Sequence, residues 1–432
     1  MSTLFLNFVI PLTKGLRRMA LPILTGLLLN GAASAQQTAS TLFENLRTMV
    51  YQVRVINIAS GDKTSIGSGF QVSADGHIAT NFHVVQLLVN KPEKYRIELV
   101  VDENAIMPAV LVAVDVLHDL AIVRVDGAGS KSFALLVKPL AKGERIYSMG
   151  NPRDLGMTII EGNFNGLVKT SRFERLLFSG SLNPGMSGGP AFTEHGEVAG
   201  VNVSTGGNQL SFLVPVKHLV DLLQRVTSAP PSDDLKGTIR QDLLNEQDAF
   251  YRARIAETWS SERFGDLMLP RTISPAMKCW GHNLDKDDIA YESFHQHCRS
   301  EEYLFLEDGF FTGNFSYSYE WMTTQTLNPV QFYAAVQERF THTSHNNVHE
   351  QSHVTNYRCV TEFVDIDNSS WKASLCLRRY KEYEGLHDAS LVMVSLHSNT
   401  HAALVRMSAT GIGRTRALEL FGKLMRSVKW TG

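Results

Sequence analysis

The sequence predicts a multidomain protein, with an all-β barrel domain over residues 41–228 followed by an α+β domain over residues 239–432. Short stretches that alternate apolar and polar residues recur between residues 50 and 215, and Asp-Gly, Asn-Pro and Gly-Gly turns separate them. The first long helical pattern comes only at Val216–Leu223. Many short strands that end in one helix are typical of a β-barrel.

The second domain follows a linker. Residues 229–238 open with Ala-Pro-Pro-Ser-Asp-Asp, a composition that favours a linker. Residues 243–259 then show a long helical pattern. Residues 315–321 alternate aromatic and polar side chains, so we expect a strand whose aromatic face belongs to the core. The order strand, strand, helix closes the chain (391–396, 402–407, 417–425).

Composition excludes several classes of partner. The chain has 432 residues, of which 44% are hydrophobic, and this is enough for more than one core. Its formal net charge is −2, and Lys and Arg are scattered along it. A nucleic-acid surface or an acidic tail is therefore not expected. No set of residues indicates a cofactor.

Residues 1–35 are typical of a signal peptide. Arg17-Arg18 forms a positive flank, residues 19–29 are apolar, and Ala33-Ser34-Ala35 is a cleavage pattern. We therefore expect an exported protein, periplasmic or secreted, that begins near Gln36.

All four cysteines lie in the last third of the chain (Cys279, Cys298, Cys359, Cys376). An even number of cysteines in an exported protein indicates disulfides, and four cysteines allow three pairings. The most local pairing, which joins the first two cysteines and the last two, is favoured. A metal site of His295, His297 and Cys298 is the alternative, but the cysteines lack the paired spacing of metal ligands.

Four histidines crowd a short stretch farther on (His342, His345, His349, His353). Their order is not that of a metal-binding helix motif, and Asn346-Asn347 favours a loop. We predict a polar surface loop, with a metal site as the alternative.

The turn around Ser187 carries the candidate chemistry. Pro184 and Pro190 exclude a helix, and glycines stand close to the serine on both sides. Without Cβ atoms in the way, backbone N–H groups can converge on one point there. Acyl transfer needs such donors for its oxyanion, beside a hydroxyl nucleophile. The structural alternative is a glycine-rich hairpin with an incidental serine.

A serine nucleophile also needs a base and a group that orients the base. His83 lies at the end of a strand-like stretch, residues 77–80, and Asp119 precedes an apolar strand. Singly, each fits a structural role, as a core or surface histidine and as a turn aspartate. Together with Ser187 they follow one of the chain orders known for this catalytic set. Asp115 competes with Asp119 for the acidic position.

Six motifs within residues 41–228 stand in a recognisable order. They are Gly67-Ser68-Gly69-Phe70, Thr80-Asn81-Phe82-His83-Val84-Val85, His118-Asp119-Leu120-Ala121, Gly150-Asn151-Pro152, Asn183-Pro184-Gly185-Met186-Ser187-Gly188-Gly189-Pro190 and Gly196-Glu197-Val198-Ala199-Gly200-Val201-Asn202. In these motifs and their order, the chain resembles the trypsin-like peptidases of the HtrA/Deg family.

The resemblance implies a chymotrypsin-like double β-barrel and a serine endopeptidase that acts on proteins or peptides. His83 would be the general base, Asp119 its orienting carboxylate and Ser187 the nucleophile. The backbone N–H groups of Gly185 and Ser187 would form the oxyanion hole.

The same resemblance implies a primary substrate pocket. Ser181 would form its floor, and Ser204 and Phe212 would stand on its walls. A serine floor offers no carboxylate to Arg or Lys, so we expect a preference for small or medium apolar residues.

Two departures from the family limit what the resemblance carries over. Residues 235–432 show no PDZ pattern, and residues 168–181 are shorter than the family's regulatory loop. Regulation by a PDZ domain is therefore not expected.

The leading hypothesis is an endopeptidase for unfolded or envelope proteins. The alternative is a catalytically latent scaffold of the same fold, whose C-terminal domain binds an envelope partner. An esterase that uses the same three residues is a third hypothesis.

Overall fold

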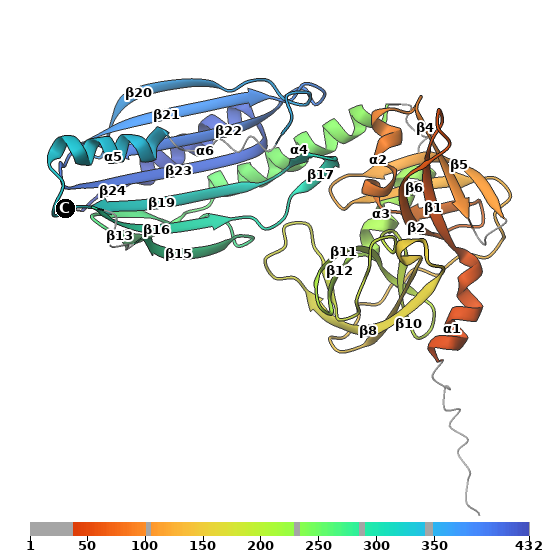
Figure 1. Ribbon diagram of the computed structural model, residues 1–432. Helices are drawn as coiled ribbons and strands as arrows, with labels where there is room; N and C mark the ends of the chain where they lie inside the picture. The colour runs from red at the N-terminus through yellow and green to blue at the C-terminus, as the bar shows by residue number, and fades with distance from the viewer. Residues whose placement is uncertain (1–37, 101–104, 229–233, 285–289, 342–348, 432) are drawn as a thin grey trace, which may run out of the picture. The chain divides into compact units, whose positions relative to one another are not determined.

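The structure is a computed structural model that describes residues 38–100, 105–228, 234–284, 290–341 and 349–431 (Figure 1). The predicted signal peptide, residues 1–35, lies outside these ranges. Within them, no helix combines the length and the apolar character that crossing a membrane requires.

The first barrel is closed and has six strands, in the order β1-β2-β3-β6-β5-β4. Helix α1 (Ala39–Leu46) and the 3₁₀ turn η1 (Arg47–Met49) precede it, and helix α2 (Phe82–Asn90) connects β3 to β4. Val53, Val55 and Ile78 are fully buried, as the alternating pattern predicts. The strands are β1 (Val50–Asn57), β2 (Lys63–Gln71), β3 (His77–Thr80), β4 (Tyr95–Val100), β5 (Ile106–Asp115) and β6 (Leu120–Val125).

The second barrel is also closed and has six strands, in the order β10-β11-β12-β9-β8-β7. Helix α3 (Val216–Ser228) follows its last strand, where the sequence predicts a helix. The other elements are β7 (Arg145–Gly150), η2 (Pro152–Asp154), β8 (Thr158–Leu167), β9 (Leu176–Phe178), β10 (Pro190–Thr193), β11 (Val198–Gly207) and β12 (Leu210–Pro215). Two closed six-stranded barrels confirm the predicted chymotrypsin-like fold.

The following region is α+β, as predicted, and is built on a seven-stranded sheet in the order β15-β16-β19-β23-β22-β21-β20. A smaller sheet, β13-β14-β24, and a β17–β18 hairpin complete the strands. The helices are α4 (Leu235–Ala256), α5 (Pro329–Thr341) and α6 (Arg414–Ser427). The strands are β13 (Ser260–Phe264), β14 (Leu267–Thr272), β15 (Lys278–Leu284), β16 (Glu292–Arg299), β17 (Leu304–Glu307), β18 (Phe310–Thr312), β19 (Phe315–Thr323), β20 (Arg358–Ile366), β21 (Ser369–Arg379), β22 (Leu386–Ser395), β23 (His401–Gly413) and β24 (Lys429–Trp430).

The aromatic strand of this region belongs to its core, as predicted. Phe315, Tyr317 and Tyr319 of β19 are almost completely buried. They pack in one apolar cluster with Tyr251 of α4 and Leu420 of α6. Burial of their rings therefore fixes both helices against the same face of the sheet.

Two disulfides join Cys279 to Cys298 and Cys359 to Cys376, which is the predicted pairing. Each links directly opposite residues of neighbouring strands. Because Cys298 is in a disulfide, the alternative metal site with the neighbouring histidines is wrong. Within the described ranges, no group of three or more His, Cys, Asp or Glu residues could hold a metal ion.

Helix α4 differs from its prediction at both ends. It begins inside the predicted linker (229–238), because the Asp234 carboxylate accepts a hydrogen bond from the backbone N–H of Gly237 (2.8 Å) and caps the helix. The helix ends before Trp259, whose indole N–H donates instead to the carbonyl of Arg254 (2.9 Å).

The described part of the histidine-rich stretch, residues 349–353, is an irregular turn as predicted, but its two histidine rings are not on the surface. His349 is buried and faces Asp388 (Nδ1 to Oδ2, 3.0 Å), and His353 stacks on Phe310 with ring centroids 4.8 Å apart. The prediction of a surface loop is wrong for these two rings, because tertiary neighbours supply an ionic partner and an aromatic face. The other two histidines of the stretch lie outside the described residues.

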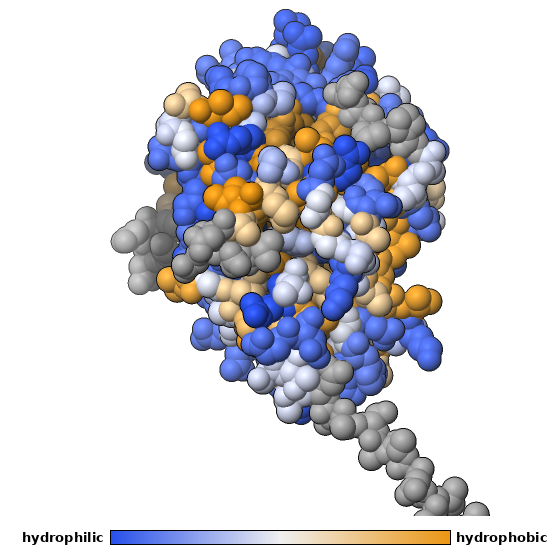
Figure 2. Space-filling view, turned by 90° about the vertical axis from the view of Figure 1, so that its right-hand side faces the viewer, coloured by the Kyte–Doolittle hydropathy of each residue, from blue (hydrophilic) through white to orange (hydrophobic). Residues whose placement is uncertain are grey.

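Exposed apolar side chains are scattered in the described part of the chain, as is usual for a folded protein. Val137, Leu155 and Val330 are examples from different segments. Figure 2 shows hydrophobic residues in small groups among hydrophilic ones on one face.

One apolar core joins the first barrel to the α+β region. Leu243 of α4 and Leu304 and Phe310 of the β17–β18 hairpin are at most 2% exposed. They belong to the same cluster as Phe82 and Val116 of the barrel part. The hairpin is thus held against the barrel by burial of apolar surface.

We expect Leu243→Ala to lower the free energy of unfolding by about 2–5 kcal/mol, because it leaves a cavity in this shared core. Denaturant unfolding followed by tryptophan fluorescence measures the loss. The matched control is Leu418→Ala on α6, where the side chain is 41% exposed and the expected loss is about 0.5 kcal/mol or less. Equal losses in the two variants would contradict the shared core.

Candidate active site

Asp119 positions the start of helix α2 and, with it, His83. The sequence places His83 at a strand end, but it is the second residue of α2. Its backbone N–H donates to Asp119 Oδ1 (2.9 Å), and the backbone N–H of Phe82 donates to the Asp119 carbonyl (3.2 Å). The first free N–H groups of the helix therefore have acceptors, which favours a helix beginning here.

The same carboxylate holds the imidazole. Asp119 Oδ2 lies 2.6 Å from His83 Nδ1. A proton on Nδ1 satisfies this bond and leaves Nε2 free to accept a proton, as a general base requires. Desolvation lowers the pKa of His83, but the charge and hydrogen bond of Asp119, with the charge of Asp308, raise this pKa above its ordinary value.

Asp115, the competing carboxylate, is engaged elsewhere. Its Oδ2 lies 2.8 Å from Nδ1 of His118 and 3.6 Å from the guanidinium of Arg225. Of the two aspartates, the structure brings Asp119 to His83.

The turn that holds Ser187 depends on glycine at two close approaches. Gly185 and Gly188 have φ values of +96° and +85°. A Cβ at Gly188 would lie 2.2 Å from the carbonyl oxygen of Ser68, and one at Gly185 would lie 2.4 Å from that of Asn151. Larger residues would push the turn away from both barrels.

Ser187 lies against strand β2, beside the residue that follows His83. The backbone N–H of Ser68 donates to the Ser187 carbonyl (2.7 Å). A Cβ at Gly67 would meet the side chain of Val84 at 2.6 Å and the Ser187 carbonyl oxygen at 3.1 Å. The turn and the start of α2 are therefore neighbours across β2.

Two backbone donors of this turn are free. The N–H groups of Met186 and Gly188 donate to the carbonyls of Asn183 (3.0 Å) and Asn202 (2.9 Å). Those of Gly185 and Ser187 have no acceptor among the residues the structure describes. Unpaired N–H groups beside a serine hydroxyl are what an oxyanion hole needs.

The hydroxyl of Ser187 does not bond to His83 in this state. Within the described chain its hydrogen bond goes to the carbonyl of Val203, at 3.4 Å. Catalytic hydrogen bonds often tighten only when substrate is bound, so this geometry is compatible with a resting serine.

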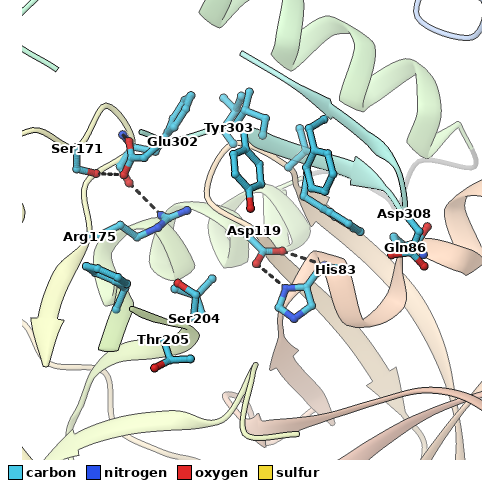
Figure 3. A pocket seen from close by; sticks show the side chains of 18 of the residues that line it. His83, Gln86, Asp119, Ser171, Arg175, Ser204, Thr205, Glu302, Tyr303 and Asp308 are labelled. Atoms are coloured by element: carbon cyan, nitrogen blue, oxygen red, sulfur yellow. Dashed lines mark hydrogen bonds and ion pairs between the residues drawn. The ribbon is translucent and has the colours of Figure 1, made fainter. Parts of the chain in front are cut away.

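A cavity of about 960 Å³ opens beside His83 and Asp119 (Figure 3). Of the residues predicted for the primary pocket, Ser204 and Phe212 line this cavity. Ser181 is exposed and lies outside its lining. Its role as a pocket floor stays a prediction.

Three aromatic residues also line the cavity: Tyr303, which directly precedes β17, and Phe305 and Phe311 of the β17–β18 hairpin. The sequence did not point to them. The alternation of Tyr303 and Phe305 with leucines signals a strand, but no local pattern tells what the strand packs against.

Residues 67–201 match the family described as a trypsin-like peptidase domain. This segment is a trypsin-like peptidase domain. The probable periplasmic serine endoprotease DegP-like of Pseudomonas putida is 30% identical to the chain over 168 residues, 37% of this chain and 34% of that protein. Its namesake in Ectopseudomonas mendocina is 31% identical over 176 residues, 38% of this chain and 35% of that protein.

These comparisons cover only part of each chain. A serine endoprotease of known structure from Yersinia pestis is 24% identical, over 44% of this chain and 66% of that chain, with a TM-score of 0.39. The chain spans about a third of the length of the sequence relatives (34% and 35%). Residues 239–432 lie outside the matched family segment.

We expect Asp119→Asn to lower the pKa of His83, because desolvation is then opposed only by the charge of Asp308 and no longer by the charge of Asp119. An NMR titration of the His83 ring measures the shift. In the parent, the raised pKa means that the pair stabilises the fold below about pH 6.5. This contribution is lost as the pH rises through the folded-state pKa.

Asp115→Asn is the matched control for this titration. It removes the partner of His118 and leaves the Asp119–His83 pair in place, so the pKa of His83 should stay at the parent value. A shift in the control of the same size as in Asp119→Asn would show that Asp119 is not the specific partner.

Proposed function

We propose that the protein is an exported serine endopeptidase that cleaves protein or peptide substrates through an acyl-enzyme on Ser187. The observation that carries the proposal is the pair of hydrogen bonds that the Asp119 carboxylate accepts from His83, in a trypsin-like peptidase domain, beside a serine turn with two free N–H groups. The relatives named serine endoproteases support the same reaction class.

The proposed reaction begins when His83 Nε2 takes the proton of the Ser187 hydroxyl as its oxygen attacks the scissile carbonyl. The carbonyl oxygen becomes an oxyanion, which accepts hydrogen bonds from the N–H groups of Gly185 and Ser187. Asp119 stabilises the imidazolium that forms. The imidazolium then protonates the leaving amine, and a water molecule repeats the sequence to release the acyl group from Ser187.

Export is proposed on three observations. The N-terminal 35 residues have the pattern of a signal peptide, and the two relatives are named probable periplasmic proteins. Both disulfides fit an oxidising compartment. Unfolded or envelope proteins are the substrates we propose for such a location.

Ser187→Ala should reduce hydrolysis of an unfolded protein substrate by at least about 10³-fold, because it removes the nucleophile. A fluorophosphonate probe should label the parent and not this variant. Ser261→Ala is the control, since Ser261 is exposed on β13, and both readouts should match the parent.

Undiminished hydrolysis by Ser187→Ala would refute the assignment of the nucleophile. A parent that neither reacts with the probe nor cleaves the substrate would favour the latent scaffold. Circular dichroism of all three proteins shows whether a loss reflects chemistry or unfolding.

A further inference from the structure

The β17–β18 hairpin and the residue directly before it bring a wall of three aromatic rings, Tyr303, Phe305 and Phe311, to the cavity beside His83. The rings of Phe305 and His83 form a T-shaped pair, with centroids 6.3 Å apart and planes at 84°. Phe311 stands opposite Phe305 in the hairpin, with ring centroids 5.6 Å apart, and Tyr303 packs on Phe311 at 4.6 Å. This aromatic wall lines the same cavity as the candidate base.

The alternation of the strand fixes which way the wall faces. Leu304 and Leu306 are buried in the core that the hairpin shares with the first barrel. Successive side chains of a strand point to opposite faces, so Tyr303 and Phe305 lie on the other side of the chain from these leucines, and Phe305 is partly buried against the edge of that core. Phe82 of α2 supports Phe305, with ring centroids 6.4 Å apart.

Polar contacts tie the base of the hairpin to the second barrel. The Glu302 carboxylate accepts hydrogen bonds from the backbone N–H groups of Arg172 (2.6 Å) and Phe173 (3.2 Å), and from the hydroxyl of Ser171. The Arg172 guanidinium also pairs with Glu246 of α4 (2.7 Å). The aromatic wall is therefore held in place before any substrate binds, which reduces the ordering cost of binding.

An extended peptide would present neighbouring side chains to opposite sides of this cavity. Ser204 and Phe212, predicted for the primary pocket, line the cavity together with His83. Figure 3 shows Ser204 on one side of Asp119 and His83, and Asp308 of the hairpin turn on the other. When the residue whose carbonyl is attacked points its side chain toward Ser204, the residue before it in the peptide therefore points its side chain toward the hairpin.

We propose that the aromatic wall is a substrate subsite that selects a large apolar side chain, such as phenylalanine or leucine. The selected residue is the one immediately N-terminal to the residue whose carbonyl is attacked. This inference rests on the proposed peptidase function. It gives the α+β region a direct role in choosing substrates. A large side chain gains apolar contact there that glycine lacks. This contact should raise kcat/KM at least about tenfold over that of the glycine peptide.

The test uses the full chain and two fluorogenic peptides that differ only at that position, Phe in one and Gly in the other. The parent should favour the Phe peptide by at least about tenfold in kcat/KM. Phe305→Ala should bring the ratio close to one. Tyr303→Ala should lower it as well, and since this ring is 58% exposed, its removal opens no core.

Phe363→Ala is the matched control. Phe363 lies on β20, is 74% exposed and does not line the cavity, so the ratio should equal that of the parent. A parent ratio near one would overturn the subsite. The subsite would also be overturned if Phe305→Ala and Tyr303→Ala both kept the parent's ratio of kcat/KM between the two peptides. This includes the case in which a variant changes the rates for both peptides by the same factor.

Probe labelling separates this failure from failure of the proposed function. A parent that is labelled on Ser187 and cleaves both peptides equally well shows that the function stands and the subsite is wrong. A parent that is neither labelled nor active on either peptide shows that the function fails, and the subsite is rejected with it.

Discussion

The two hydrogen bonds of one carboxylate are the constraint on which the site depends. Asp119 accepts from the backbone N–H and from Nδ1 of His83, at 2.9 and 2.6 Å, so a single residue starts helix α2 and sets the tautomer of the ring. Asp119 accepts both bonds with a φ of 60°, a backbone conformation that costs free energy in a residue with a side chain. The fully buried start of β6, at Leu120, holds the backbone in that conformation. The chemistry of the base therefore depends on packing of the first barrel.

The second barrel contributes the turn that holds Ser187, and the side chain of Ser68 connects this barrel to the first one. The hydroxyl of Ser68 donates to the Gly185 carbonyl (2.7 Å) and accepts from the backbone N–H of Asn151 (3.0 Å). At Gly188 the backbones approach so closely that a Cβ would lie 2.2 Å from the Ser68 carbonyl oxygen. These contacts leave little freedom for the turn, so the free N–H groups around Ser187 are oriented by the fold before any substrate arrives.

The α+β region is attached to the barrels by apolar burial and by hydrogen bonds, and these two kinds of interaction contribute differently. Burial of Leu243 and Leu304 supplies free energy without fixing a direction. The carboxylate of Glu302, which receives two backbone N–H groups, adds the direction that apolar packing lacks. Together they place Phe305 within 6.3 Å of the His83 ring, centroid to centroid. A region outside the matched family segment thereby becomes part of the cavity wall.

The sequence by itself predicted a strand-rich barrel domain, favoured the local disulfide pairing and singled out His83, Asp119 and Ser187 as candidates, because strand period, turn residues and cysteine spacing are local properties of a chain. The division into two barrels was implied by the family resemblance and confirmed by the structure. Only the tertiary structure decided that α2 begins before His83 and that hairpin aromatic residues line the cavity. Glu302 and Arg172 are 130 positions apart, and the sequence around either residue does not indicate that the two are in contact. An alternating strand tells which side chains share a face, but only packing decides what that face meets.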